Sequence, residues 1–231
     1  MSVDSSLAID TENMGEKQLQ LLAEYVAKQL GAFFPVGNIE SDKQRIFELL
    51  PDVIQRLKPI LKAVRCFDSK IFNYIHSLQY TTFLYLLANE HWRKDPKSPI
   101  FADRLFYLNR ALNSIDLFYS IELPSVFCIG HGGLGTVLGN VVYGERLVVF
   151  HNVTIGRVGD MRPKIGKNVV IYTGAVVTGN TMIGDGSVVS AGTILHNVEV
   201  PADVIAASVN GQIIFKPRNR DYTDLYFEHE A

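Results

Sequence analysis

The stretch IGKNVVIYTGAVVTGNTMIGDGSVVSAGTIL (165–195) carries an apolar residue at every sixth position. These anchors are Ile165, Ile171, Val177, Ile183, Val189 and Leu195. A small or apolar residue follows each of the first five anchors by four positions, and glycine recurs one or three positions after an anchor in IGKNVV, IGDGSV and VSAGTI. A simple two-residue alternation of apolar and polar residues would not place glycine at these positions relative to the anchors. A hexapeptide period instead predicts a parallel β-helix, in which three short strands and three turns form one coil.

The same period extends upstream, with two interruptions. The earlier anchors are Leu123, Ile129, Val137, Tyr143, Val149 and Ile155. Two extra residues precede Val137 and four precede Ile165. The repeat therefore predicts a β-helix domain over residues 121–217 with about four coils, followed by a C-terminal tail, 218–231.

Residues 1–120 have a different composition. Of 18 glycines in the chain, 15 lie between Gly130 and Gly211, so the first half is poor in turn residues. Apolar residues at helical spacing predict helices over 16–34, from about 41 onward, over 69–92 and over 101–115, with a turn at 94–99. Pro51 and Pro59 leave the continuity of the second helix open. The predicted fold class is α+β, an all-α N-terminal domain followed by a parallel β-helix.

Charge and cysteine content exclude several classes of protein. The 22 basic and 24 acidic residues give a net charge of −2, which does not suit nucleic acid as a partner. The N-terminal sequence 1–17 lacks the basic and apolar regions of a secretory signal. The most apolar window, 72–87, contains too many polar residues for a membrane span. Cys66 and Cys128 suit a reducing compartment, so we expect a cytoplasmic protein.

The period also brings distant residues together. Since one coil is three hexads, residues three anchors apart stack on one edge, about 5 Å apart. His131, His151, Thr173 and Ala191 each lie two positions after such an anchor, so they are predicted to form a column. The interruptions GGLGT (132–136) and GRVGDMRP (156–163) are both expected beside this edge, where they would form one wall of a cleft. The alternative interpretation is that both histidines are solvated turn residues.

Four segments resemble a known family. HGGLGTVLG (131–139), NVTIG (152–156), RPKIG (162–166) and AASVNGQIIFKP (206–217) are similar to serine O-acetyltransferases and related hexapeptide acyltransferases. The resemblance implies a left-handed β-helix and acetyl-CoA as co-substrate, with no metal. It also implies a homotrimer or a dimer of trimers, with active sites between neighbouring β-helices.

The resemblance further implies roles for individual residues. His131 matches the general base, which takes a proton from the acceptor hydroxyl, and His151 is a second catalytic candidate. Thr173 and Ala191 match positions that hold the pantetheine arm, and Lys216 is a candidate partner for a coenzyme A phosphate. Asp160 and Arg162 are candidates for binding the acceptor.

Three departures from serine acetyltransferases bear on the acceptor. Gly130 stands where the family has an aspartate, Arg162 stands where it has a second histidine, and its acidic residue for the serine ammonium has no match. These departures favour a sugar or surface-polysaccharide hydroxyl, with L-serine, for cysteine biosynthesis, as the alternative. A zinc enzyme would need three converging histidines, of which only His131 and His151 are suitably placed. A non-catalytic trimeric scaffold is the remaining class.

Overall fold

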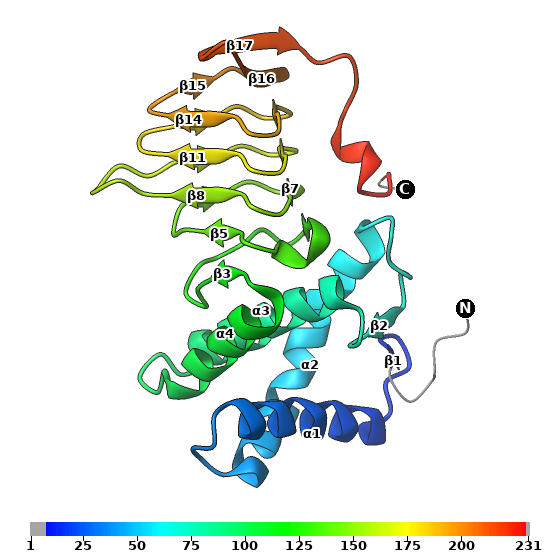
Figure 1. Cartoon of the computed structure of the whole chain (residues 1–231). Helices are drawn as coiled ribbons and strands as arrows, with labels where there is room; N and C mark the ends of the chain where they lie inside the picture. Colours follow the sequence, from blue (N-terminus) through cyan, green and yellow to red (C-terminus); the bar gives the residue numbers. More distant parts are fainter. Residues whose placement is uncertain (1–7, 230–231) are drawn as a thin grey trace.

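A computed structural model describes residues 8–229 of the chain. Its N-terminal part is helical and lies against one end of the β-helix (Figure 1). The helices are α1 (Glu16–Phe33), α2 (Ile39–Ala63), α3 (Ser77–Lys94) and α4 (Ile100–Asn113). Within residues 8–229, no helix has both the length and the hydropathy needed to span a bilayer.

The structure corrects the start of α3 and shows that α2 is continuous. The predicted helix over 69–92 is wrong at its start, because Ile71–Asn73 forms strand β2, antiparallel to β1 (Ala8–Asp10). The β2 backbone is paired with β1, and Phe72 is fully buried there, so α3 begins only at Ser77. By contrast, α2 continues through Pro51 and Pro59. An interior proline costs about 3 kcal/mol, and here the buried apolar face of α2 outweighs that cost.

The β-helix is left-handed and consists of three parallel sheets. The first sheet contains β4 (Phe127–Ile129), β7 (Leu147–Val149), β10 (Val170–Ile171), β13 (Val188–Val189) and β16 (Val204–Val209), with β17 (Gln212–Pro217) added antiparallel. The second contains β3 (Asp116–Leu117), β5 (Val137–Leu138), β8 (Thr154–Gly156), β11 (Val176–Thr178) and β14 (Ile194–His196). The third contains β6 (Val142–Tyr143), β9 (Lys164–Ile165), β12 (Met182–Ile183) and β15 (Glu199–Val200).

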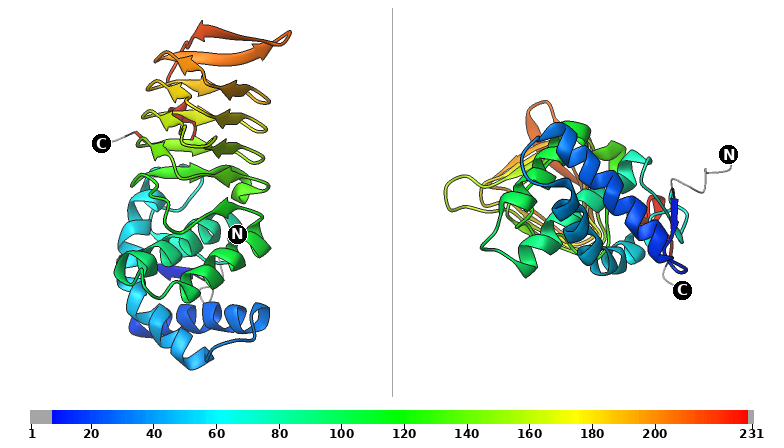
Figure 2. Two further views of the ribbon diagram at one scale, coloured as in Figure 1. Left: turned by 90° about the vertical axis from the view of Figure 1, so that its left-hand side faces the viewer. Right: turned by 90° about the horizontal axis from the view of Figure 1, so that it is seen from below.

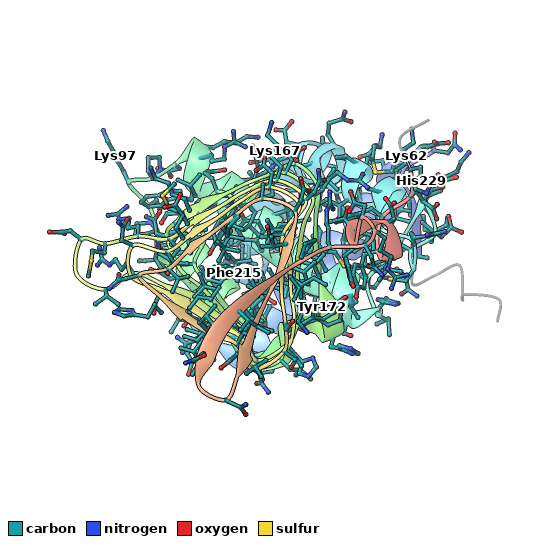
Figure 3. All side chains as sticks on the ribbon, turned by 90° about the horizontal axis from the view of Figure 1, so that it is seen from above. Lys62, Lys97, Lys167, Tyr172, Phe215 and His229 are labelled. Carbon is teal, nitrogen blue, oxygen red and sulfur yellow. The ribbon has the colours of Figure 1, made fainter. Side chains whose placement is uncertain are left out.

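The stack has about five coils, one more than predicted, because strands outside the regular repeat extend it at both ends. β3 begins at Asp116, before the predicted domain boundary at 121, and pairs with β5. At the other end β17 lies across the last coil (Figures 1 and 3).

The predicted anchors form the core of the β-helix, with two corrections. Leu123 lies in no strand and is only partly buried. Ile129, Val149, Ile171 and Val189 are almost fully buried. Val137, however, is 38% exposed, whereas Leu138 is buried and pairs with Ile155. The anchor of that coil is therefore Leu138, and the preceding loop holds three extra residues. A one-residue shift in a strand turns every side chain to the opposite face, which is why the sequence period misplaced it.

After β17 the chain returns along the outside of the first sheet to the helical part (Figures 1 and 2). We call residues 218–229 the C-terminal strap. It contains the short helix η2 (Thr223–Leu225), and Phe227 forms an antiparallel bridge with Val64 just after α2. Phe227 is fully buried, so the strap is packed into the molecule.

Candidate active site

The strand register confirms the predicted column. Ile129 pairs with Val149, Val149 with Ile171, and Ile171 with Val189. Two residues after these positions the chain turns from the first sheet into the second, and there His131, His151, Thr173 and Ala191 follow one another along one corner. The N–H of Gly192 donates to the carbonyl of Thr173 at 2.9 Å, which ties these two levels together.

His131 lies in a strained turn, η1 (Gly130–Gly133). Its φ of 55° and ψ of 28° are left-handed, which costs a non-glycine residue about 1–2 kcal/mol. The helical part holds this turn in place. Thr81 Oγ1, whose hydroxyl donates to the Ser77 carbonyl at 2.8 Å, also lies 3.3 Å from the Gly132 carbonyl. A Cβ at Gly133 would lie 2.7 Å from Ile115 Cδ1, so only glycine fits there.

The two histidines of the column are in contact. The ring centroids of His131 and His151 are 5.0 Å apart, and the ring planes are at 88°. The His131 side chain is exposed, whereas His151 is partly buried. Nδ1 of His151 is buried and has no hydrogen-bond partner among residues 8–229. The corner therefore presents one accessible imidazole, supported edge to face by a second.

An aromatic ring fills the space beside Gly130. A Cβ at Gly130 would lie 3.0 Å from Cδ1 of Phe150. The Phe150 ring is 5.9 Å from that of His131 and stacks on Tyr172, with centroids 5.2 Å apart and planes at 25°. A side chain immediately before His131 would therefore have to displace the Phe150 ring by a few tenths of an ångström. The glycine at position 130, a departure from the resembled family, allows Phe150 to pack closely against the backbone here.

The rest of the column is a strip of small residues. Thr173, Gly174, Ala191 and Gly192 follow His151 along the corner, and a Cβ at Gly192 would meet nothing within 4 Å. The strip is therefore lined by small residues and leaves room for a narrow, extended ligand. Lys216 is exposed on β17. It lies opposite Ile205 of β16, the strand that pairs with β13 beyond the end of the strip.

The second interruption does not lie where the sequence argument put it. Residues 157–163 follow β8, so they project from the corner between the second and third sheets, at the far end of β8 from His151 (Figure 1). The loop is a small hairpin closed by a bridge between Val158 and Met161, with Asp160 and Arg162 exposed. The expectation that both interruptions border the histidine edge is therefore wrong. The six-residue period gives the order of the corners along the chain. Strand β8 lies between the histidine corner and the corner that carries the loop 157–163.

One acidic residue near the loop 132–136 was missed by the sequence argument. Asp116 on β3 pairs with Val137, and its N–H donates to the Thr136 carbonyl at 2.8 Å. Its partly exposed carboxylate lies 3.7 Å from Arg110 Nη2. The available signal was an aspartate between apolar residues in SIDLFYSIEL (114–123), which we did not assign to a strand.

The remaining histidines lie outside the column. His196 is exposed and bonds Thr178 Oγ1 at 3.1 Å, and His91 is buried with Nε2 3.0 Å from the Ser98 carbonyl. In the described part of the chain, no three side chains of His, Cys, Asp or Glu are grouped as a metal site would require.

Comparison with known proteins agrees with this architecture. Residues 162–205 match the family model for the bacterial transferase hexapeptide (six repeats). The serine acetyltransferase of Synechococcus elongatus is 28% identical over 131 residues, which are 54% of this chain and 53% of that protein. This chain thus spans about half the length of that relative. The serine acetyltransferase of Salmonella typhimurium is 25% identical, over 89% of this chain and 77% of its own length.

Similarity in structure extends over both parts of the chain. A serine acetyltransferase solved in complex with CoA superposes with a TM-score of 0.68 and 22% identity, covering 89% of this chain and 88% of that one. At this identity the likeness establishes the fold. Together with the hexapeptide match and the sequence relatives, it shows a hexapeptide-repeat protein that resembles the serine acetyltransferases.

Proposed function

We propose that this protein is an acetyl-CoA-dependent O-acetyltransferase whose acceptor is the hydroxyl of L-serine. The observation that carries the proposal is the contact between His131 and His151 at the head of a strip of small residues. The column occurs in a fold shared with serine acetyltransferases, one of them solved with CoA. The sequence relatives favour L-serine over the sugar acceptor that the sequence argument had placed first.

The chemistry requires one proton acceptor. His131 takes the proton of the acceptor hydroxyl while that oxygen bonds to the thioester carbonyl carbon. The carbon–sulfur bond then breaks, and the sulfur leaves with the bonding electrons. It recovers the proton from the imidazolium as the free thiol of CoA. The oxyanion formed on the way needs N–H donors, for which the backbone of the loop 132–136 is the candidate.

Acetyl-CoA, the acetyl donor, would lie along the corner that carries His131 and His151. Its pantetheine arm would follow Thr173 and Ala191, whose side chains leave the strip open, and Lys216 at the end of the β-helix would approach a phosphate. Both cysteines are free thiols, which agrees with a reducing cytoplasmic setting.

The structural objection to serine is weaker than the sequence suggested. Arg162, which would repel an ammonium group, lies at the far end of β8 from the histidines of its own protomer. Asp116 offers a carboxylate near the end of the loop that begins after His131, and Arg110 beside it offers a cation for the serine carboxylate. We therefore assign Asp116 as the residue that holds the ammonium group.

A homotrimer or a dimer of trimers completes the proposal. The loop 157–163 projects away from the histidine corner of its own chain. In a three-fold assembly the loop of one protomer would meet the histidine corner of the next, so that Asp160 and Arg162 would act on the neighbour's acceptor, with Arg162 directed at the serine carboxylate and not at its ammonium group.

The direct test is steady-state acetyl transfer with L-serine beside a panel of neutral and acidic sugars. We expect a kcat/KM for L-serine of at least about 10⁴ M⁻¹s⁻¹, within the usual enzyme range, and much lower values for the sugars. His131→Ala should lower kcat by roughly 10²–10⁴-fold without loss of folding, because the side chain is exposed. A preference for a sugar over L-serine, or full turnover by the variant, would contradict the proposal.

A further inference from the structure

The C-terminal strap is fixed at both of its ends. At its start Arg218 pairs with Asp203 at 2.6 Å. At its end the Glu228 N–H donates to the Ala63 carbonyl at 2.7 Å, and the Arg65 N–H donates to the Tyr226 carbonyl at 2.9 Å. The strap thus connects the last coil of the β-helix to the end of α2.

Between these ends, Tyr226 of the strap contacts the aromatic residues beside the histidine corner. Its hydroxyl lies 2.9 Å from the hydroxyl of Tyr172. Its ring packs edge to face on Phe150, with centroids 5.4 Å apart and planes at 70°. Figure 3 shows Tyr172 on the side of the β-helix along which the strap returns.

Phe150 therefore lies between the strap and the turn of His131. One contact runs from Tyr226 to Phe150, and Phe150 in turn lies against Gly130 and 5.9 Å from the His131 ring. Since the turn at His131 is left-handed and strained, it persists only where its surroundings hold it. Thr81 holds it from the helical side, and Phe150 holds it from the side of the strap.

We propose that Tyr226 is a positioning residue for catalysis, which presses Phe150 against Gly130 and so fixes the orientation of the His131 imidazole. This inference rests on the proposed function, in which His131 is the base. On this basis Tyr226 acts on the active site although it lies 95 residues after His131 in the sequence.

The test compares three full-length variants. Tyr226→Ala removes both the ring and the hydroxyl, Tyr226→Phe removes only the hydroxyl, and Leu225→Ala alters an exposed neighbour in the strap. For Tyr226→Ala we expect kcat to fall roughly 10- to 100-fold, the range for a small misplacement of a reacting group, with KM for acetyl-CoA within about twofold of wild type. Tyr226→Phe and Leu225→Ala should both keep kcat within a factor of about three.

A second readout does not depend on turnover. In protein labelled with ¹³C and ¹⁵N histidine, the ring signals of His131 are assigned by their absence in His131→Ala. They should shift or broaden in Tyr226→Ala and remain unchanged in Leu225→Ala. If wild-type protein fails to acetylate L-serine, the proposed function is wrong, and these signals still decide whether the strap positions His131.

Unchanged His131 signals and full kcat in folded Tyr226→Ala would overturn the inference. An equal loss of kcat in Leu225→Ala would also overturn it, because the effect would then be general loosening of the strap. If Tyr226→Ala does not fold, Tyr226→Leu retains apolar bulk but loses the edge-to-face contact, and the same two readouts apply to it.

Discussion

The imidazole of His151 meets that of His131 edge to face, with ring centroids 5.0 Å apart, although 19 residues separate them in the chain. The contact follows from the coil length, because each turn of the β-helix returns the backbone to the same corner one strand higher. A side chain in this position packs against the edge of the imidazole that we propose as the base.

Replacement of His151 should therefore affect catalysis without abolishing it. Ring contacts of this kind contribute about 0.5–1.5 kcal/mol, which corresponds to a loss of about two- to tenfold in kcat for His151→Ala. His151→Phe keeps a ring at the same place and should recover most of that loss. Steady-state kinetics decide the matter: a loss of 10³-fold or more in both variants would make His151 a second proton-transfer group.

The packing of Gly130 against Phe150 predicts an intolerant position. In Gly130→Ala the new methyl group would lie 3.0 Å from Phe150 Cδ1, and Phe150 is held by Tyr172 and Tyr226. Overpacking of this kind costs about 1–3 kcal/mol of stability, which urea unfolding would measure.

Gly156→Ala is the matched control for that substitution. A Cβ at Gly156 meets nothing within 4 Å, and its φ is not left-handed. It should be neutral or stabilise the protein by about 0.4–1 kcal/mol. Equal unfolding midpoints for the two variants would show that Phe150 moves aside freely.

The assignment of Asp116 predicts a selective effect on the acceptor. A charge-assisted hydrogen bond contributes about 1.5–3 kcal/mol, so Asp116→Asn should raise KM for L-serine roughly 10- to 100-fold. KM for acetyl-CoA should remain unchanged, because the strip assigned to acetyl-CoA, at Thr173 and Ala191, lies on later coils of the β-helix, whereas Asp116 lies on its first strand. Glu199→Gln, which alters an exposed carboxylate on the third sheet, is the control; an equal rise in that variant would remove the assignment.

The two cysteines should differ sharply in reactivity. Burial raises the pKa of the Cys128 thiol to about 12, whereas the Cys66 side chain is exposed. Since only the thiolate reacts, a Cys66→Ser variant should resist thiol reagents at pH 8 until it unfolds. The raised pKa of Cys128 also makes the free energy of unfolding depend on pH. As pH rises from about 9 toward 12, the thiol is deprotonated in the unfolded chain but not in the folded one, so the free energy of unfolding should fall. Rapid labelling of folded Cys66→Ser at pH 8 would contradict the burial of Cys128.

The sequence by itself determined the β-helix and its histidine column. A six-residue period fixes which residues point inward and which share a corner, so the sequence alone aligns His131, His151, Thr173 and Ala191. It also determined the helical character of the first half, because the spacing of apolar residues along a helix can be read from a short stretch of sequence. It misplaced two anchors, Leu123, which lies in no strand, and Val137, where Leu138 is the buried residue, because segments of irregular length have no period to set their register.

Only the tertiary structure decided what surrounds that column. The short strand at Ile71–Asn73 exists because β1 pairs with it, and no local pattern encodes that partner. The corner from which the loop 157–163 projects, the ring of Phe150 against Gly130 and the return of Tyr226 to the histidine corner all depend on contacts between distant segments. Periodicity describes how a coil repeats along its own axis. It carries no information about segments that leave the repeat and pack against its outer face, and in this protein those segments hold the His131 turn in place.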